Sequence, residues 1–386
     1  MIDYYRGILD DPVRQAAFQK AVNREVRPGD VVVDLGCALG NFSVYACRAG
    51  AARVYAVEAA GIIGVAREVV EANGFGDRVT FLRGRSTSLE VPERADVVIF
   101  EDFATTLVSP GVVATVTDAV RRWLKPGGTL VPHRGRIWVA PVEDAHGHRE
   151  LDRFAWTGDR VFGVDVSPSR RAAFATSHPR HLKPGALLAE PTLAGEVDLA
   201  RVSSAALKVE ASVEVTRMGA IHGLLLWFDL EVGGEWLRMG PLGPEAVWPQ
   251  VLFPFSEPPV AEAGQVVELA LEAGPFGHEQ VWRWRVAVGE TKREGNSLDG
   301  LSLQADELAR WDPDRVPELE PELATDRFVL TAVDGVKTLD EIAGALRERF
   351  PERFSDVEES QRRVLETLQR KQGSGAGGGA GPESLA

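Results

Sequence analysis

Cysteine is nearly absent from this sequence, since Cys37 and Cys47 are the only two among 386 residues. So few cysteines in a chain of this length exclude a disulfide-stabilised scaffold. C-x-x-C spacings and mixed histidine–cysteine clusters, which mark zinc sites, do not occur in the sequence. His146 and His148 form an isolated H-x-H on a polar segment, which we interpret as a solvated turn. We therefore expect no metal site.

Positive charge is also scarce, because 43 lysines and arginines face 57 acids and leave a net charge of −14. Nucleic-acid binding needs basic surface to neutralise phosphates, so we expect no nucleic-acid partner. The most apolar run, GLLLWF (223–228), is too short to span a bilayer. The N-terminal MIDYYRGILDDPVRQ lacks the apolar core of a signal peptide. A cytoplasmic protein with no membrane partner is the expectation that remains.

The first third of the sequence contains an alternation of helical and strand patterns. Asp11 as an N-cap and Pro12 at the first helical position predict a helix over 10–22. The other predicted helices cover 41–50, 62–74 and 112–124, and the predicted strands cover 31–36, 52–59, 78–84 and 95–102, with another strand after KPGGTLVP (125–132). Strands alternating with helices predict a parallel, doubly wound α/β sheet.

The pattern changes near residue 133. Short runs of period two, separated by glycine and proline, predict an antiparallel barrel or sandwich over 133–290, with a partly helical insertion at 153–175. A connector follows and includes the proline-rich DPDRVPELEPEL (312–323). Helices are predicted at 338–350, where Thr338 and Glu341 form a capping box, and at 357–371. The predicted division of the chain is 1–132 for the parallel domain, 133–300 for the barrel, 301–371 for a helical region and 372–386 for a disordered tail.

The first strand runs into a glycine-containing turn in VVVDLGCALGNFS (31–43). Asp34 precedes Gly36 by two residues, and Gly40 enters the following helix. One interpretation is a tight turn that needs glycine, and the other is a nucleotide pocket at the edge of the sheet. A carboxylate would repel the pyrophosphate of NAD but would attract the cationic amino-acid end of S-adenosylmethionine (SAM). The motif D-x-G-x-x-x-G therefore favours SAM over NAD.

Two later strand ends fit the same nucleotide pocket. Glu58 closes the second strand 22 residues after Gly36, where an acid can accept hydrogen bonds from ribose hydroxyls. NAD sites share this feature, so it indicates a nucleoside without choosing between the two. GRSTSLEVP (84–92), which contains Ser86, follows the third strand, where an adenine edge would be read.

Residues 1–142 resemble the SAM-binding domain of class I methyltransferases, and specifically of the protein arginine methyltransferase family. The matching stretches there are ILDDPVRQAAF (8–18), AGAARVYAVEA (49–59) and LKPGGTLVPHRGRIWVAPVE (124–143). Downstream, RVFGVDVSP (160–168), GAIHGLLLWFDLEV (219–232) and EAVWPQVLFPF (245–255) extend the resemblance to about residue 290. It implies a Rossmann-like SAM-binding domain followed by an antiparallel β-barrel, SAM as cofactor, and a homodimer. It also implies that Arg14 clamps the SAM carboxylate.

The acceptor site departs from that family. ADVVIFEDFATTLVSP (95–110) places Glu101 where the family has the first of two glutamates that hold the substrate arginine, but Pro110 stands at the second position. A pair of carboxylates matches the fork of a guanidinium, whereas one carboxylate orients an amine or accepts its proton. Asp102 is left with two interpretations, assistance to a cationic amine or a side chain facing solvent. Three further departures are Ala38 for glycine, Val247 for histidine, and Thr87 and Ser88 for an acid near the adenine.

The last part of the chain resembles the helical half of small winged-helix domains that bind leader peptides in peptide natural-product pathways. The matching residues are Asp334, Gly335, Thr338, Leu339, Glu341, Ile342 and Leu346. The alternative is a two-helix structural appendage. If the resemblance is real, the substrate is a ribosomal peptide.

These observations favour a SAM-dependent methyltransferase with an altered acceptor site, which N-methylates a peptide, a protein or a small-molecule natural product. Glu101 is the predicted catalytic residue. The predicted cofactor-binding residues are Arg14, Asp34, Gly36, Gly40, Glu58 and Ser86. The alternatives are a true protein arginine methyltransferase with a rebuilt acceptor site and a non-catalytic SAM-binding scaffold in a peptide-modification complex.

Overall fold

The computed structural model describes residues 2–152, 164–244, 248–276, 279–300, 314, 316 and 321–371. The chain divides into two compact units, Met1–Ser302 and Leu303–Ala386, which are described separately. Val247, most of the predicted connector and the predicted disordered tail lie outside the described residues. The predicted insertion at 153–175 is described only from residue 164 onward, where α7 (Ser169–Phe174) is helical.

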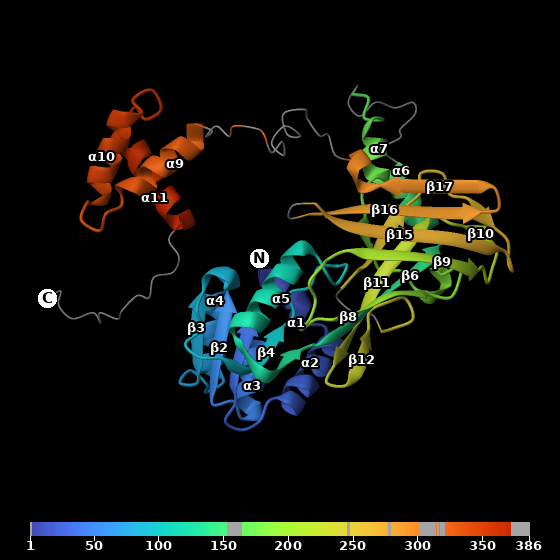
Figure 1. Ribbon diagram of the computed structural model, residues 1–386, viewed down its shortest axis with the longest axis horizontal. Helices are drawn as coiled ribbons and strands as arrows, with labels where there is room; N and C mark the ends of the chain where they lie inside the picture. The colour runs from blue at the N-terminus through green and yellow to red at the C-terminus, as the bar shows by residue number, and fades with distance from the viewer. Residues whose placement is uncertain are drawn as a thin grey trace. The chain divides into compact units, whose positions relative to one another are not determined.

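A five-stranded parallel sheet forms the first part of unit 1, as the sequence predicts (Figure 1). Its strands are β1 (Val31–Leu35), β2 (Arg53–Glu58), β3 (Val79–Arg83), β4 (Ala95–Phe100) and β5 (Leu124–Val131). The strand order is β3-β2-β1-β4-β5, with all neighbours parallel. Strands β2 and β3 are added on one side of β1, and β4 and β5 on the other, so the switch point lies between β1 and β4. Ligands of such sheets bind outside the carboxyl ends of the strands at this switch point.

The helices around this sheet are α1 (Ile2–Leu9), α2 (Pro12–Glu25), α3 (Asn41–Ala49), α4 (Ile63–Ala72) and α5 (Pro110–Arg122). Helix α2 begins as predicted, because the Asp11 side chain accepts a hydrogen bond from the backbone N–H of Arg14 at 2.9 Å and Pro12 is the first helical residue. Helix α1 was not predicted as an element of its own.

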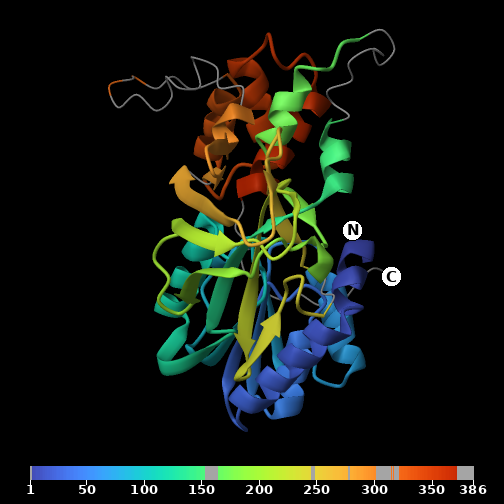
Figure 2. The same ribbon diagram turned by 90° about the vertical axis from the view of Figure 1, so that its right-hand side faces the viewer.

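Antiparallel strands form the second part of unit 1, which confirms the predicted change of pattern after residue 133. Figure 2 shows these strands, coloured green to orange, next to the parallel domain, which is coloured blue to teal. One sheet has the order β7-β13-β11-β6-β8 with β12 paired to β11, and the other has the order β17-β16-β15-β9. The strands of the first sheet are β6 (Arg134–Val142), β7 (His178–Arg180), β8 (Thr192–Asp198), β11 (Gly223–Val232), β12 (Glu235–Arg238) and β13 (Gln250–Pro254). The strands of the second are β9 (Leu207–Glu214), β15 (Val266–Phe276), β16 (Glu279–Val288) and β17 (Thr291–Asn296), and β10 (Gly219–Ala220) pairs separately with β14 (Val260–Ala261).

The interpretation of the H-x-H segment as a solvated turn was wrong. His146 and His148 lie in helix α6 (Ala145–Asp152), and the His148 ring nitrogen Nε2 is 3.2 Å from the carbonyl oxygen of Phe255. The two histidines are therefore placed by a helix, and the second of them contacts the barrel.

One continuous hydrophobic core joins the parallel and antiparallel parts of unit 1. The Phe103 ring, in the loop after β4, lies 6.4 Å from the ring of Phe228 on β11, and Phe228 lies 6.0 Å from Trp248. These contacts fix the loop after β4, which carries the predicted acceptor residue, against the barrel.

The described part of unit 2 consists of α9 (Pro321–Ala332), α10 (Leu339–Arg349) and α11 (Val357–Lys371), with a core of its own. The predicted capping box is present, because the Thr338 hydroxyl accepts from the backbone N–H of Glu341 and the Glu341 carboxylate accepts from that of Thr338. The prediction of a connector up to residue 323 was wrong at its end. Helix α9 begins at Pro321, since proline is well tolerated at a first helical position. Among the described residues, no helix has both the length and the apolar character needed to cross a bilayer.

Candidate active site

A cavity of about 820 Å³ lies at the carboxyl ends of β1, β2 and β4. The parallel register places Leu35 beside both Val57 and Phe100, so the residues that follow these three strands emerge together. Five of the predicted site residues line the cavity, namely Arg14, Gly36, Glu58, Ser86 and Glu101. Asp34 and Gly40 are not among the lining residues.

Asp34 lies behind the cavity wall. Its side chain is 1% exposed, and its carboxylate accepts a hydrogen bond from the Ser43 hydroxyl at 2.6 Å. Burial raises the pKa of the Asp34 carboxyl to about 6. Gly40 is held in a left-handed conformation at the start of α3, where a Cβ would lie 3.3 Å from the carbonyl oxygen of Ala66. Both residues shape the turn after β1, and their direct contact with a cofactor stays a prediction.

Glu58 is fixed at the end of β2 by two backbone donors. Its carboxylate accepts from the N–H of Ala60 at 2.8 Å and from the N–H of Ala38 at 3.2 Å. Ala38 has φ +48, a left-handed conformation that favours glycine. The family's glycine at this position thus has a backbone reason, and alanine occupies the same conformation here with some strain.

Arg14 and Glu101 form a bidentate ion pair on the cavity wall. The Nε and Nη2 groups of Arg14 donate to the two carboxylate oxygens of Glu101, and Nη1 donates to the carbonyl oxygen of Ile8 at 3.0 Å. The Arg14 side chain is 3% exposed, and its guanidinium lies 5.2 Å from the centre of the Trp248 ring. Burial raises the pKa of the Glu101 carboxyl to about 7, although the charge and hydrogen bonds of Arg14 oppose the shift.

Asp102 also borders the cavity, which favours the first of its two interpretations. A Cβ built on Gly36 would lie 3.7 Å from the Cβ of Asp102, so the acid stands next to the turn after β1. Partial burial and the negative charge of Glu58 raise the pKa of the Asp102 carboxyl. Glu58, Glu101 and Asp102 are the acids among the described lining residues.

The position of the family's second glutamate is the first residue of helix α5. Pro110 begins this helix, and the Ser109 hydroxyl caps it by accepting from the N–H of Val112 at 3.2 Å. Helix α5 contributes Gly111, Ala114 and Thr115 to the cavity wall, none of which carries charge. The other altered acceptor position, Val247, lies outside the described residues, while its neighbour Trp248 lines the cavity.

Helix α1 supplies lining residues that the sequence reasoning missed. Tyr5, Ile8 and Leu9 border the cavity, and Gln15 donates from its side chain to the carbonyl oxygen of Ile8 at 3.2 Å. The spacing i, i+3, i+4 of these three residues is the pattern of one helix face and could have indicated that this face borders a site. Arg14 and Gln15 together tie α1 to the site.

Two family models match the chain. A methyltransferase domain covers residues 32–128, and an arginine methyltransferase oligomerization subdomain covers residues 133–281. The chain is 32% identical over 280 residues to a probable histone-arginine methyltransferase CARM1 of Oryza sativa subsp. indica, which covers 68% of this chain and 53% of that protein. It is 31% identical over 245 residues to a probable protein arginine N-methyltransferase 6 of Arabidopsis thaliana, which covers 60% of this chain and 55% of that protein. The chain therefore spans little more than half the length of these two relatives.

Solved structures resemble the chain over about three quarters of its length. The Trypanosoma brucei PRMT1 enzyme–prozyme heterotetrameric complex with AdoHcy matches with a TM-score of 0.68 at 22% identity, over 76% of this chain and 97% of that one. Arabidopsis thaliana protein arginine methyltransferase 10 matches with a TM-score of 0.66 at 23% identity, over 77% of this chain and 98% of that one. These likenesses confirm the predicted fold, a Rossmann-like domain followed by an antiparallel barrel.

Proposed function

We propose that the chain is a SAM-dependent methyltransferase similar to the protein arginine methyltransferases, and that it transfers a methyl group to an amine nitrogen of a peptide or natural product. The observation that carries this proposal is that one cavity is lined both by Glu58, the strand-end acid expected to bind a ribose, and by the carboxylates of Glu101 and Asp102. Three acids line the cavity together with Arg14 and Arg85, and Glu101 is paired with Arg14. The two other acids, Glu58 and Asp102, suit a cofactor that carries positive charge better than one that carries pyrophosphate.

The residues around the cavity fit SAM group by group. Glu58 would accept from the ribose hydroxyls, Gly36 allows close approach of the ligand to the backbone, and Ser86 lies on the side assigned to the adenine. Arg14 uses three of its five N–H groups in the contacts described above, so two remain for the carboxylate of the cofactor. Bound SAM supplies an electrophilic methyl group on a sulfonium, and the protein has to hold the acceptor nitrogen in line with it.

Glu101 is the proposed catalytic residue. Near neutral pH an aliphatic amine is an ammonium ion, which must lose a proton before the nitrogen lone pair can attack. The Glu101 carboxylate, whose conjugate acid has a pKa of about 7, can accept that proton. In the transfer the nitrogen–carbon bond forms, the carbon–sulfur bond breaks with its electron pair left on sulfur, and the amine proton passes to Glu101.

An amine is a better proposed acceptor than a guanidinium for two reasons. The second carboxylate of the family's pair is replaced by Pro110, and both oxygens of Glu101 already accept from Arg14. A substrate guanidinium would compete with an internal one for the same carboxylate. A true protein arginine methyltransferase is the second candidate, favoured by the relatives' names and by Asp102, an acid beside Glu101 that borders the cavity.

We propose two partners in addition. The barrel would support a homodimer, because an arginine methyltransferase oligomerization subdomain matches residues 133–281. Unit 2 would bind a leader peptide, because it has its own core and exposes Leu323 and Leu330 on α9 and Val333 directly after it. Exposed apolar side chains can contribute to a surface that binds a peptide.

The test is a methyl-transfer screen with isotopically labelled methyl groups on SAM. Matched synthetic peptides that differ only in carrying a free amine or an arginine would be compared as acceptors, with the Glu101→Gln variant as control. Label on the amine peptides alone supports the proposal, and label on arginine alone supports the second candidate. If S-adenosylhomocysteine (SAH) binds while no acceptor is labelled, the non-catalytic scaffold gains support; if neither SAM nor SAH binds, the methyltransferase assignment fails.

A further inference from the structure

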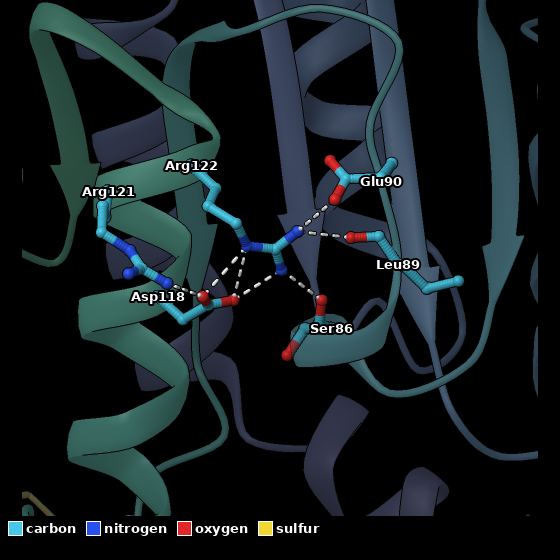
Figure 3. A network of polar contacts seen from close by, with 6 residues as sticks. All are labelled: Ser86, Leu89, Glu90, Asp118, Arg121 and Arg122. Atoms are coloured by element: carbon cyan, nitrogen blue, oxygen red, sulfur yellow. Dashed lines mark hydrogen bonds and ion pairs between the residues drawn. The ribbon is translucent and has the colours of Figure 1, made fainter.

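The loop after β4 that carries Glu101 (the acceptor loop) leads into the first turn of helix α5. A second arginine, in the last turn of that helix, connects α5 to the loop after β3. Figure 3 shows Arg122 in the last turn of α5 with its guanidinium directed at residues 86–90. Its Nη2 donates to the carbonyl oxygen of Ser86 at 2.8 Å, and its Nη1 donates to the carbonyl oxygen of Leu89 at 2.6 Å. Glu90 adds a side-chain contact to Nη1 at 3.2 Å.

Asp118, one turn earlier on α5, holds this guanidinium in place. Its carboxylate accepts from Nε of Arg122 at 3.0 Å and from Nη2 at 2.5 Å. The neighbouring Arg121 also donates to Asp118, at 3.0 Å, but its side chain is 74% exposed against 21% for Arg122. Figure 3 shows that Arg121 lies on the far side of Asp118 from the loop, so it offers a matched comparison.

The loop that Arg122 holds is a single turn of 3-10 helix, η1 (Ser86–Ser88). Its own backbone hydrogen bonds are local, from the N–H of Ser88 to Arg85 at 2.9 Å and from the N–H of Leu89 to Ser86 at 3.2 Å. Short 3-10 turns are weak elements, so bonds from another helix to both ends of this turn add a constraint that it does not supply. Ser86 and Thr87 of this turn line the cavity.

Helix α5 therefore contacts the cavity in two ways. Its first turns contribute Gly111, Ala114 and Thr115 to the wall that follows the acceptor loop, and its last turn fixes the wall formed by η1. One helix thus sets the position of the acceptor side and of the nucleoside side of the site.

We propose that Arg122 is a positioning residue for cofactor binding, which acts by holding η1 so that Ser86 and Thr87 face the nucleoside. This proposal rests on the proposed function, because it takes SAM as the ligand of the cavity. Arg122 does not line the cavity itself, so its effect should reach the ligand only through the loop.

The experiment measures SAH affinity by calorimetry, and the KM for SAM and kcat on the best acceptor, for the full-length chain. Arg122→Gln should weaken SAH binding and raise the KM for SAM by about tenfold or more, because a charged group with bonds to two carbonyls is lost. The kcat at saturating SAM should stay within about a factor of three, since the acceptor side is untouched. Arg121→Gln should change neither value by more than about twofold.

Arg122→Lys provides the second variant if the glutamine variant fails to fold. Lysine keeps the charge and the pair with Asp118, but its single ammonium cannot reproduce the planar set of bonds to Ser86 and Leu89, so an intermediate loss of affinity is expected. Unchanged SAH affinity in Arg122→Gln or Arg122→Lys would overturn the proposal, as would equal losses in the Arg121 and Arg122 variants. A wild-type chain that binds no SAH would instead contradict the proposed function, so the two failures are distinguishable.

Discussion

The guanidinium of Arg14 and the carboxylate of Glu101 form a bidentate pair across 87 residues of sequence. Arg14 comes from the first turn of α2 and Glu101 from the loop after β4. The pair ties the N-terminal helices to the acceptor loop. It also gives the proposed catalytic carboxylate a charged partner before any substrate arrives.

Loss of Arg14 should destabilise the protein through the charge that it leaves behind. Arg14→Met should lower the free energy of unfolding at pH 8 by about 3 kcal/mol, because Glu101 would stay buried and unpaired. Urea unfolding would measure this change. The double variant Arg14→Met with Glu101→Leu should recover much of the loss, whereas additive losses would contradict a coupled pair.

Glu101→Gln should reduce turnover on an amine acceptor by about 100-fold or more, because the proton acceptor is lost. SAH affinity should stay within about threefold, since the cofactor contacts are made by other residues. In the wild type, kcat should rise as the pH increases through about 7, where the Glu101 carboxyl ionises. If the residual kcat of Glu101→Gln rose with pH in the same way as that of the wild type, the titration would belong to another group.

The elements of unit 1 could largely be predicted because their signals are local. The Asp11–Pro12 helix start, the glycine at the end of β1 and the acid at the end of β2 each depend on a few neighbouring residues. The Arg14–Glu101 pair could not be predicted, because it depends on how two elements distant in sequence meet and on the rotamers they adopt. The sequence likewise does not indicate that Asp34 lies behind the cavity rather than on its wall, because an acid near the end of a strand has the same sequence pattern in both cases.

Asp34 should make stability fall as the pH rises from about 4 to 6. Its folded-state pKa of about 6 lies above the ordinary value of 3.8, so the folded protein holds the proton more tightly than the unfolded chain. The stabilisation is complete below pH 3.8 and is lost as the pH rises through 6, with a full difference of roughly 3 kcal/mol. Asp34→Asn keeps an acceptor for Ser43 and removes the titration. The free energy of unfolding of the variant, relative to wild type, should therefore be larger at pH 8 than at pH 5. Equal gains at both pH values in urea unfolding would exclude this group as the cause.

Ala38→Gly should stabilise the turn after β1 by up to about 1 kcal/mol, because the left-handed conformation strains an alanine and not a glycine. The measurement is the free energy of unfolding in urea. Ala52→Gly is the matched control, since Ala52 is exposed and is not among the residues with positive φ. The control should lower the free energy of unfolding by about 0.5 kcal/mol through backbone entropy alone. Losses of the same size in both variants would show that the conformation of Ala38 carries no strain.

Truncation after Ser302 should leave cofactor binding intact. The described core of unit 2, which includes Val329, Ile342 and Leu346, is separate from the core that surrounds the cavity. SAH affinity of the truncated chain should therefore agree with that of the full chain within about twofold, and the full chain should unfold in two transitions where the truncated chain shows one. For an acceptor peptide found in the screen, truncation should raise the KM about tenfold while turnover of a small amine stays constant, because only the peptide would use unit 2. An unchanged KM for the peptide would make unit 2 a structural appendage, and a loss of SAH binding would show that the cavity depends on residues beyond Ser302.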